Sequence, residues 1–151
     1  QLQEGFPALR IFPGLERSVG RDRLLHLLVL GTTDPEYLRL DSEEEVLKKA
    51  RSEGHLTVLA HPFRWEGAAE MLEAGRLADA LEFRTGNHDA RCAALAEEAG
   101  LKFGLPLVNA GDTHDLSFLN RFWMETDRPL GSAGEIRRIV LAGDYRNCLG
   151  K

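Results

Sequence analysis

The chain has 151 residues, of which 43% are hydrophobic, enough for one domain with a sizeable core. Its formal net charge of −5 argues against a surface built mainly to bind nucleic acid or an acidic membrane. No apolar run approaches the roughly 20 residues of a membrane span, and residues 1–4 lack the features of a secretory signal. We therefore expect a single cytoplasmic domain over residues 1–151, with Cys92 and Cys148 as free thiols.

Short apolar runs alternate with amphipathic segments along the chain. The pattern predicts strands at residues 9–13, 24–30, 56–60, 80–84, 105–110 and 122–126. It predicts helices at residues 43–53, 67–77, 88–99 and 133–142. Capping boxes, in which a serine is followed three residues later by a glutamate, precede the first and last of these helices, at Ser42–Glu45 and Ser132–Glu135.

Alternating strands and helices are typical of an α/β fold with a largely parallel sheet and helices on its surface. An open sheet and a barrel both fit this order. Residues of metal-binding type lie in or after at least four of the expected strands, and a barrel mouth gathers side chains from many strands around one point. The distribution therefore favours a parallel-strand, TIM-like barrel.

Candidate metal ligands lie in or near the ends of the expected strands. They are Glu16, His26, His61, Asp112 and His114. Imidazoles and carboxylates bind Zn²⁺, Mn²⁺ and Fe²⁺. Such an ion lowers the pKa of a bound water and polarises a phosphoryl or carbonyl oxygen. The sequence therefore predicts hydrolysis by a metal-activated water, and it contains no Gly-x-Ser-x-Gly elbow or Walker A loop that would favour other chemistry.

Polar residues just beyond the strand ends are candidate substrate contacts. They are Arg64, Arg84, Asn87 and His88. A guanidinium group at such a position can hold a phosphate through two hydrogen bonds. Structural roles stay open at this stage: surface ion pairing for the arginines, helix capping for His88, and a hydrogen-bonded core position for His26.

The order of these motifs resembles the PHP family, the polymerase and histidinol phosphatase metal-dependent phosphoesterases. The matching segments, between about Phe12 and Gly150, are Gly14-Leu15-Glu16, His26, Ala60-His61-Pro62, Leu81-Glu82 with Asn87, and Gly111-Asp112-Thr113-His114. The resemblance implies a distorted (β/α)₇ barrel, with Glu16 bridging two or three Mn, Zn or Fe ions and the other four candidates as terminal ligands. It also implies hydrolysis of a nucleotide, a short oligonucleotide or a small-metabolite phosphate.

One departure from the family pattern concerns the start of the chain. PHP proteins begin with a His-x-His motif, and residues 1–14 contain no histidine. We therefore expect this chain to be the carboxyl-terminal part of a longer protein, and to self-associate through the incomplete side of its barrel. A non-catalytic PHP-like module and an amidohydrolase-type metal hydrolase remain alternatives, although the positions of Glu16 and His26 match the PHP order better.

Overall fold

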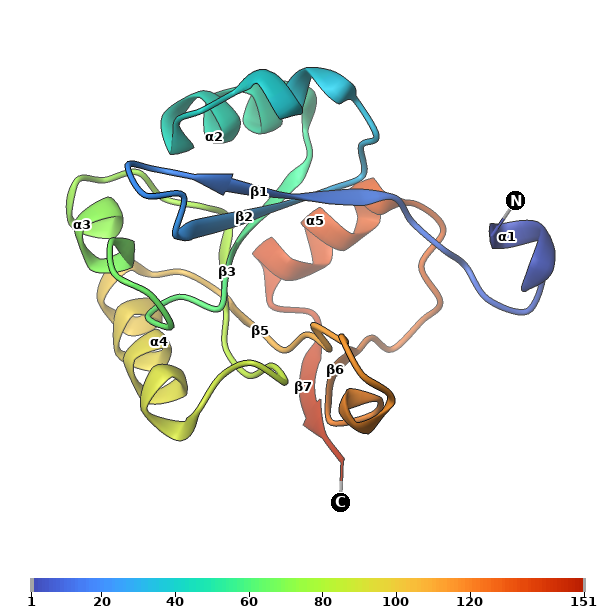
Figure 1. Cartoon of the computed structure of the whole chain (residues 1–151). Coiled ribbons are helices and arrows are strands. Elements are labelled where there is room, and N and C mark those ends of the chain that lie inside the picture. The colour runs from blue at the N-terminus through green and yellow to red at the C-terminus, as the bar shows by residue number, and fades with distance from the viewer. Residues whose placement is uncertain (1, 151) are drawn as a thin grey trace.

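The computed structural model describes residues 2–150 (Figure 1). Its helices are α1 (Leu2–Gly5), α2 (Glu43–Glu53), α3 (Ala68–Glu73), α4 (Ala90–Phe103) and α5 (Ala133–Ala142). Its strands are β1 (Gly14–Val19), β2 (Leu25–Leu30), β3 (Leu56–Ala60), β4 (Ala80–Glu82), β5 (Leu107–Val108), β6 (Phe122–Glu125) and β7 (Arg146–Leu149). Short 3₁₀ turns occur at η1 (Pro35–Arg39) and η2 (Leu116–Phe118).

The main sheet has the strand order β1-β2-β3-β4-β5. β2 pairs antiparallel with both β1 and β3, whereas β3, β4 and β5 run parallel. β6 and β7 form a separate antiparallel pair. Within residues 2–150 the sheet runs from one edge to the other and does not close. The expected (β/α)₇ TIM-like barrel is therefore wrong, and the fold is an open, mixed α/β sheet.

A tight hairpin between β1 and β2 explains the departure from a parallel sheet. Residues 20–24 join the two strands, and a parallel crossover needs about a dozen residues or more. Gly20 enters the turn with φ of 82°, and Arg23 leaves it with φ of 55°. Parallel pairing begins at β3, where α3 and α4 lie in the connections to β4 and β5.

The ends of the helices follow the capping signals with one exception. Both expected capping boxes form, with the Ser42 and Ser132 hydroxyls accepting the N–H groups of Glu45 and Glu135. Helix α4, however, continues through Gly100. A Cβ at Gly100 would lie 2.9 Å from Leu107 Cδ2, so this glycine permits close packing of α4 on β5 rather than ending the helix.

Helices cover both faces of the sheet. Leu27, Leu59 and Leu81 belong to the core under α2, α3 and α4, whereas Val58 and Ala80 pack in a second core with α5. Figure 1 shows α2 and α5 on opposite sides of β1 and β2. The second core is smaller than the first. Polar side chains occupy the far end of the same face of the sheet, and they form the candidate site.

Two further sequence expectations can be compared with the fold. No helix within residues 2–150 has the length and apolar character needed to cross a membrane. Cys92 on α4 and Cys148 on β7 are free thiols, as expected. Burial raises the pKa of the Cys92 thiol, which fits a structural residue better than a nucleophile.

Candidate metal centre

Glu16, His26 and His61 form a compact cluster, with one potential ligand atom from each lying within 4.8 Å of the others. Glu16 Oε1 accepts a hydrogen bond from His26 Nδ1 at 2.5 Å and lies 3.6 Å from His61 Nε2. The two imidazole rings meet edge to face, with their centroids 4.8 Å apart. One carboxylate and two imidazoles are a suitable donor set for Zn²⁺, Mn²⁺ or Fe²⁺. The cluster could therefore hold a metal ion.

The register of the antiparallel strands brings these side chains together. Glu16 pairs with Leu28, so its side chain is the diagonal neighbour of His26 on the same face of the hairpin. His26 pairs with Ala60, the last residue of β3, and His61 follows directly. His26 thus lies near the start of an antiparallel strand, not at the carboxyl end of a parallel one. Strand pairing therefore assembles the cluster without a barrel.

The backbone is strained in the loops that follow β3 and β5. His61 has φ of 29° and Phe63 has φ of 68°, while Asp112 has φ of 40°. Non-glycine residues rarely adopt positive φ, at a cost of about 1–3 kcal/mol, and such residues concentrate at functional sites. His61 is also 6% exposed, so this strain lies in well-packed surroundings. Both loops are therefore held in unusual conformations beside the cluster.

Charges and hydrogen bonds shift the pKa values within the cluster. The close contact with His61 is the largest influence on Glu16 and, with the contribution of His26, lowers its pKa to about 2 despite partial burial. Burial lowers the pKa of His61, but the close contact with Glu16 and the nearby charges of Glu82, Glu16 and Asp112 raise it overall. Near neutral pH, Glu16 is therefore ionised, and protons compete with a metal for His61.

Glu82, at the end of β4, belongs to the matched motif Leu81-Glu82, but no role in the site was assigned to it from the sequence. It is 1% exposed, and its Oε2 accepts a 2.5 Å hydrogen bond from the His61 N–H. Burial raises the pKa of Glu82 to about 7, although the N–H and the charge of His61 lower it. The sequence signal for a buried carboxylate here was Glu82 at the end of the apolar run Ala80-Leu81. This run forms a short strand that lies between two other strands.

Asp112 and His114 lie in the loop after β5, where they form a second group with Asn87. The Asn87 amide donates a hydrogen bond to Asp112 Oδ2, and His114 Nδ1 lies 3.4 Å from Asp112 Oδ1. The negative charge of Asp112 acts on His61, which connects this group with the cluster. Among the described residues, however, neither Asp112 nor His114 belongs to the compact set of three donors.

The remaining candidate residues occupy the loops after β3 and β4. Arg64 and Arg84 are exposed, and each guanidinium lies over the aromatic ring of a sequence neighbour, at 5.1 and 5.0 Å from the ring centroid. The His88 ring contacts two backbone oxygens, with Nδ1 3.0 Å from Phe83 O and Nε2 2.9 Å from Pro62 O. His88 therefore links the two loops through both ring nitrogens.

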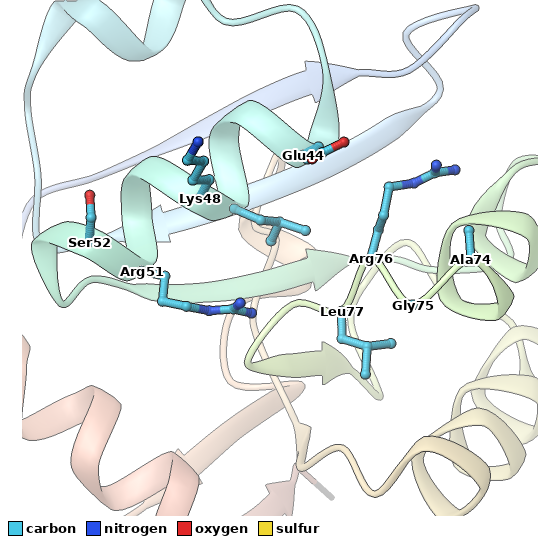
Figure 2. Close-up of a pocket in the computed structure, with 9 residues that line it drawn as sticks. Glu44, Lys48, Arg51, Ser52, Ala74, Gly75, Arg76 and Leu77 are labelled. Carbon is cyan, nitrogen blue, oxygen red and sulfur yellow. The ribbon is translucent and has the colours of Figure 1, made fainter.

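A groove of about 620 Å³ lies between α2 and the loop joining α3 to β4 (Figure 2). Lys48 and Arg51 from α2 and Arg76 from the loop line it. Its floor includes Leu47, a core residue on the face of the sheet opposite to α5. The groove therefore lies away from the metal cluster and does not form part of that site.

The chain matches no protein-family model and no curated protein. Its function is therefore inferred from the side chains that the fold brings together. Three carboxylates act on His61 and raise its pKa through their charges. They are those of Glu16, Glu82 and Asp112. The ionised carboxylate of Glu16 beside the two imidazoles favours a bound divalent cation.

Proposed function

We propose that this chain carries a metal-dependent phosphoesterase site of the PHP type, in which Glu16, His26 and His61 hold a divalent ion. The compact cluster of these three donors is the observation that carries the proposal. The order of the motifs, from Gly14-Leu15-Glu16 to Asp112-Thr113-His114, adds support. This likeness concerns the residues of the site and their order, not the barrel.

The donor set suits Mn, Zn or Fe, which when bound lowers the pKa of a water and polarises a phosphoryl oxygen. Ionised Glu16 contributes charge, and its contacts with His26 and His61 are made through Oε1. Its other oxygen, Oε2, would be the one offered to a second ion in a site of two or three ions. Asp112, held by a hydrogen bond from Asn87, is a further carboxylate that would contribute to such a site.

Phosphate esters are the proposed substrates, whether nucleotides, short oligonucleotides or phosphorylated small metabolites. Arg64 and Arg84 support this class because their exposed guanidinium groups follow the strands that end at the site, where each lies over a neighbouring aromatic ring. A guanidinium can hold two phosphate oxygens at once. In this proposal the protein works in the reducing cytosol, which its free thiols support.

A second candidate function is a metal-binding module without catalysis. Among the described residues only three donors form the compact cluster, whereas His114 is 73% exposed. Three protein donors suffice to hold one ion with water completing its coordination. This arrangement would stabilise the hairpin against β3 without any turnover.

The test combines metal binding with hydrolysis on the same samples. Chelator-treated protein is titrated with Mn²⁺ and with Zn²⁺ by calorimetry, and hydrolysis of p-nitrophenyl phosphate and bis-p-nitrophenyl phosphate is followed with each ion. We expect His61→Ala to lose both properties. His55→Ala is the control because His55 contacts Glu53, outside the cluster. Metal binding without hydrolysis would favour the second candidate, and absence of binding would overturn both.

A further inference from the structure

The carboxylate of Glu82 contacts the backbone of His61. Its Oε2 accepts the His61 N–H at 2.5 Å. Among the described residues, Glu82 is not part of the compact donor set. It is nevertheless 1% exposed, which is unusual for a carboxylate and requires a specific partner. The His61 N–H is that partner.

The backbone at His61 needs such support. Its φ of 29° lies in the left-handed region, which is unfavourable for any residue with a Cβ. The next residue is Pro62, and a residue before proline strongly prefers extended backbone with negative φ. Two independent preferences therefore oppose the conformation of His61. A strained backbone of this kind persists only where its surroundings hold it.

Glu82 lies on an interior strand, where it can support the backbone of His61. Leu59 pairs with Leu81 in the parallel β3–β4 ladder, so Glu82 lies beside the end of β3, where His61 leaves the sheet. On its other side Glu82 pairs with Val108 of β5. A side chain fixed on an interior strand is a better support than one on a mobile loop.

We propose that Glu82 is a positioning residue of the metal centre, whose carboxylate holds the backbone of His61 in the conformation that directs its imidazole towards Glu16 and His26. The proposal rests on the proposed function only in treating His61 as a metal ligand. Groups that orient a ligand typically contribute about 10- to 100-fold to metal affinity. The hydrogen bond, not the negative charge, is the operative contact.

Three variants separate these roles. Glu82→Gln keeps an oxygen that can accept the His61 N–H but removes the charge. Glu82→Met has a similar length and removes the oxygen acceptor, with Glu82→Leu as the substitute if it does not fold. Asp79→Ala is the matched control because Asp79 is another largely buried carboxylate that accepts a β3 N–H, that of Thr57 at 3.0 Å.

Two measurements are made on each folded variant. The first is affinity for Zn²⁺ and Mn²⁺ by calorimetry, where we expect Glu82→Met to lose about 10- to 100-fold and Glu82→Gln to stay within about threefold of the parent. The second is the NMR cross-relaxation between the rings of His26 and His61 in metal-free protein. It should persist in Glu82→Gln and in Asp79→Ala and disappear in Glu82→Met.

The outcomes distinguish this inference from the proposed function. If the parent binds no metal, the proposed function fails, and the ring contacts alone decide whether Glu82 positions His61. Equal losses of metal affinity in Glu82→Gln and Glu82→Met would show that the negative charge of Glu82 is what matters, and this would overturn the inference. Unchanged affinity and unchanged ring contacts in Glu82→Met would overturn it as well, while leaving the metal site intact.

Discussion

Glu16 on β1 and His26 on β2 face each other diagonally across an antiparallel hairpin, with Oε1 2.5 Å from Nδ1. These two donors are separated by only ten positions in sequence. A short hairpin can therefore form this half of the site locally, and pairing of β2 with β3 then adds His61. The site depends on one long-range strand pairing rather than on closure of a whole barrel.

The first prediction concerns the interdependence of these two donors. Glu16→Ala and His26→Ala should each reduce affinity for Zn²⁺ by on the order of 100-fold or more, because a ligand matters at least as much as a group that orients one. The double variant should lose far less than the product of the single losses, since either change already dismantles the site. Calorimetric titration of the three variants and the parent measures this coupling, and additive losses would contradict it.

The second prediction is stabilisation by metal. An ion that binds only the folded state adds about 2.7 kcal/mol when its free concentration is 100 times the Kd. For a chain of this size that corresponds to a rise in Tm of about 5–10 °C. Thermal unfolding of the parent with and without Zn²⁺ tests the effect, which should be absent in His61→Ala. An equal rise in both proteins would assign the stabilisation to another site.

Local sequence signals predicted most of the elements but not their directions, and they missed β7 (Arg146–Leu149). The capping boxes at Ser42 and Ser132 and the strand at residues 56–60 are confirmed. The alternation of apolar residues is the same in parallel and antiparallel strands, so it did not show that β2 runs against β3. The first strand was expected at residues 9–13 rather than at Gly14–Val19, and this hid the short turn at residues 20–24 that marks a hairpin. Without attention to it, strand–helix alternation was taken as a parallel barrel.

The residues of the metal site were also predicted only in part, because the sequence does not show which strands lie side by side. His61 and Glu16 were selected as ligands by their motifs, and His26 by its place in an apolar run, and the fold brings all three together. Glu82 was missed because burial of a carboxylate at a strand end depends on the strands beside it. The Asp112-Thr113-His114 motif predicted two ligands, but His114 is largely exposed and lies outside the compact cluster, so its part in metal binding stays a prediction.

The third prediction concerns the pH dependence of stability. Folding raises the pKa of Glu82 from 4.5 to about 7, so its contribution to stability is fully present below pH 4.5 and is lost as the pH rises through 7. A shift of this size corresponds to about 3 kcal/mol. Glu82→Gln has no such loss, so its stability relative to the parent should increase by up to ~3 kcal/mol between pH 4 and pH 8.

Urea unfolding in the presence of a chelator, at pH 4, 6 and 8, measures this difference without interference from metal. Glu125→Gln is a suitable control because Glu125 is exposed and its pKa is lowered, mainly by a hydrogen bond from Trp123. Its stability relative to the parent should not increase with pH. A constant difference between Glu82→Gln and the parent would show that the Glu82 carboxyl is not desolvated.

The fourth prediction concerns acid stability. The pKa of Glu16 falls from 4.5 to about 2 on folding, mainly through its close contact with His61. The ionised carboxylate therefore stabilises the fold above pH 4.5, and this contribution is lost as the pH falls towards 2. Because Glu16 is 41% exposed, solvent screening should keep the effect within about 1 kcal/mol. Acid titration of the metal-free parent and Glu16→Gln should show the parent's advantage disappearing between pH 4.5 and 2.

The last prediction tests whether Asp112 belongs to the electrostatic surroundings of His61. The charge of Asp112 raises the pKa of His61, but less than the close contact with Glu16 does. Asp112→Asn should therefore lower the His61 pKa, and Glu16→Gln should lower it further. NMR titration of the ring protons in metal-free protein measures both changes. Asp115→Asn is the control because Asp115 caps η2 through Ser117, and it should leave the His61 pKa unchanged. If Asp112→Asn also left it unchanged, Asp112 would lie too far from His61 to help bind an ion at this centre.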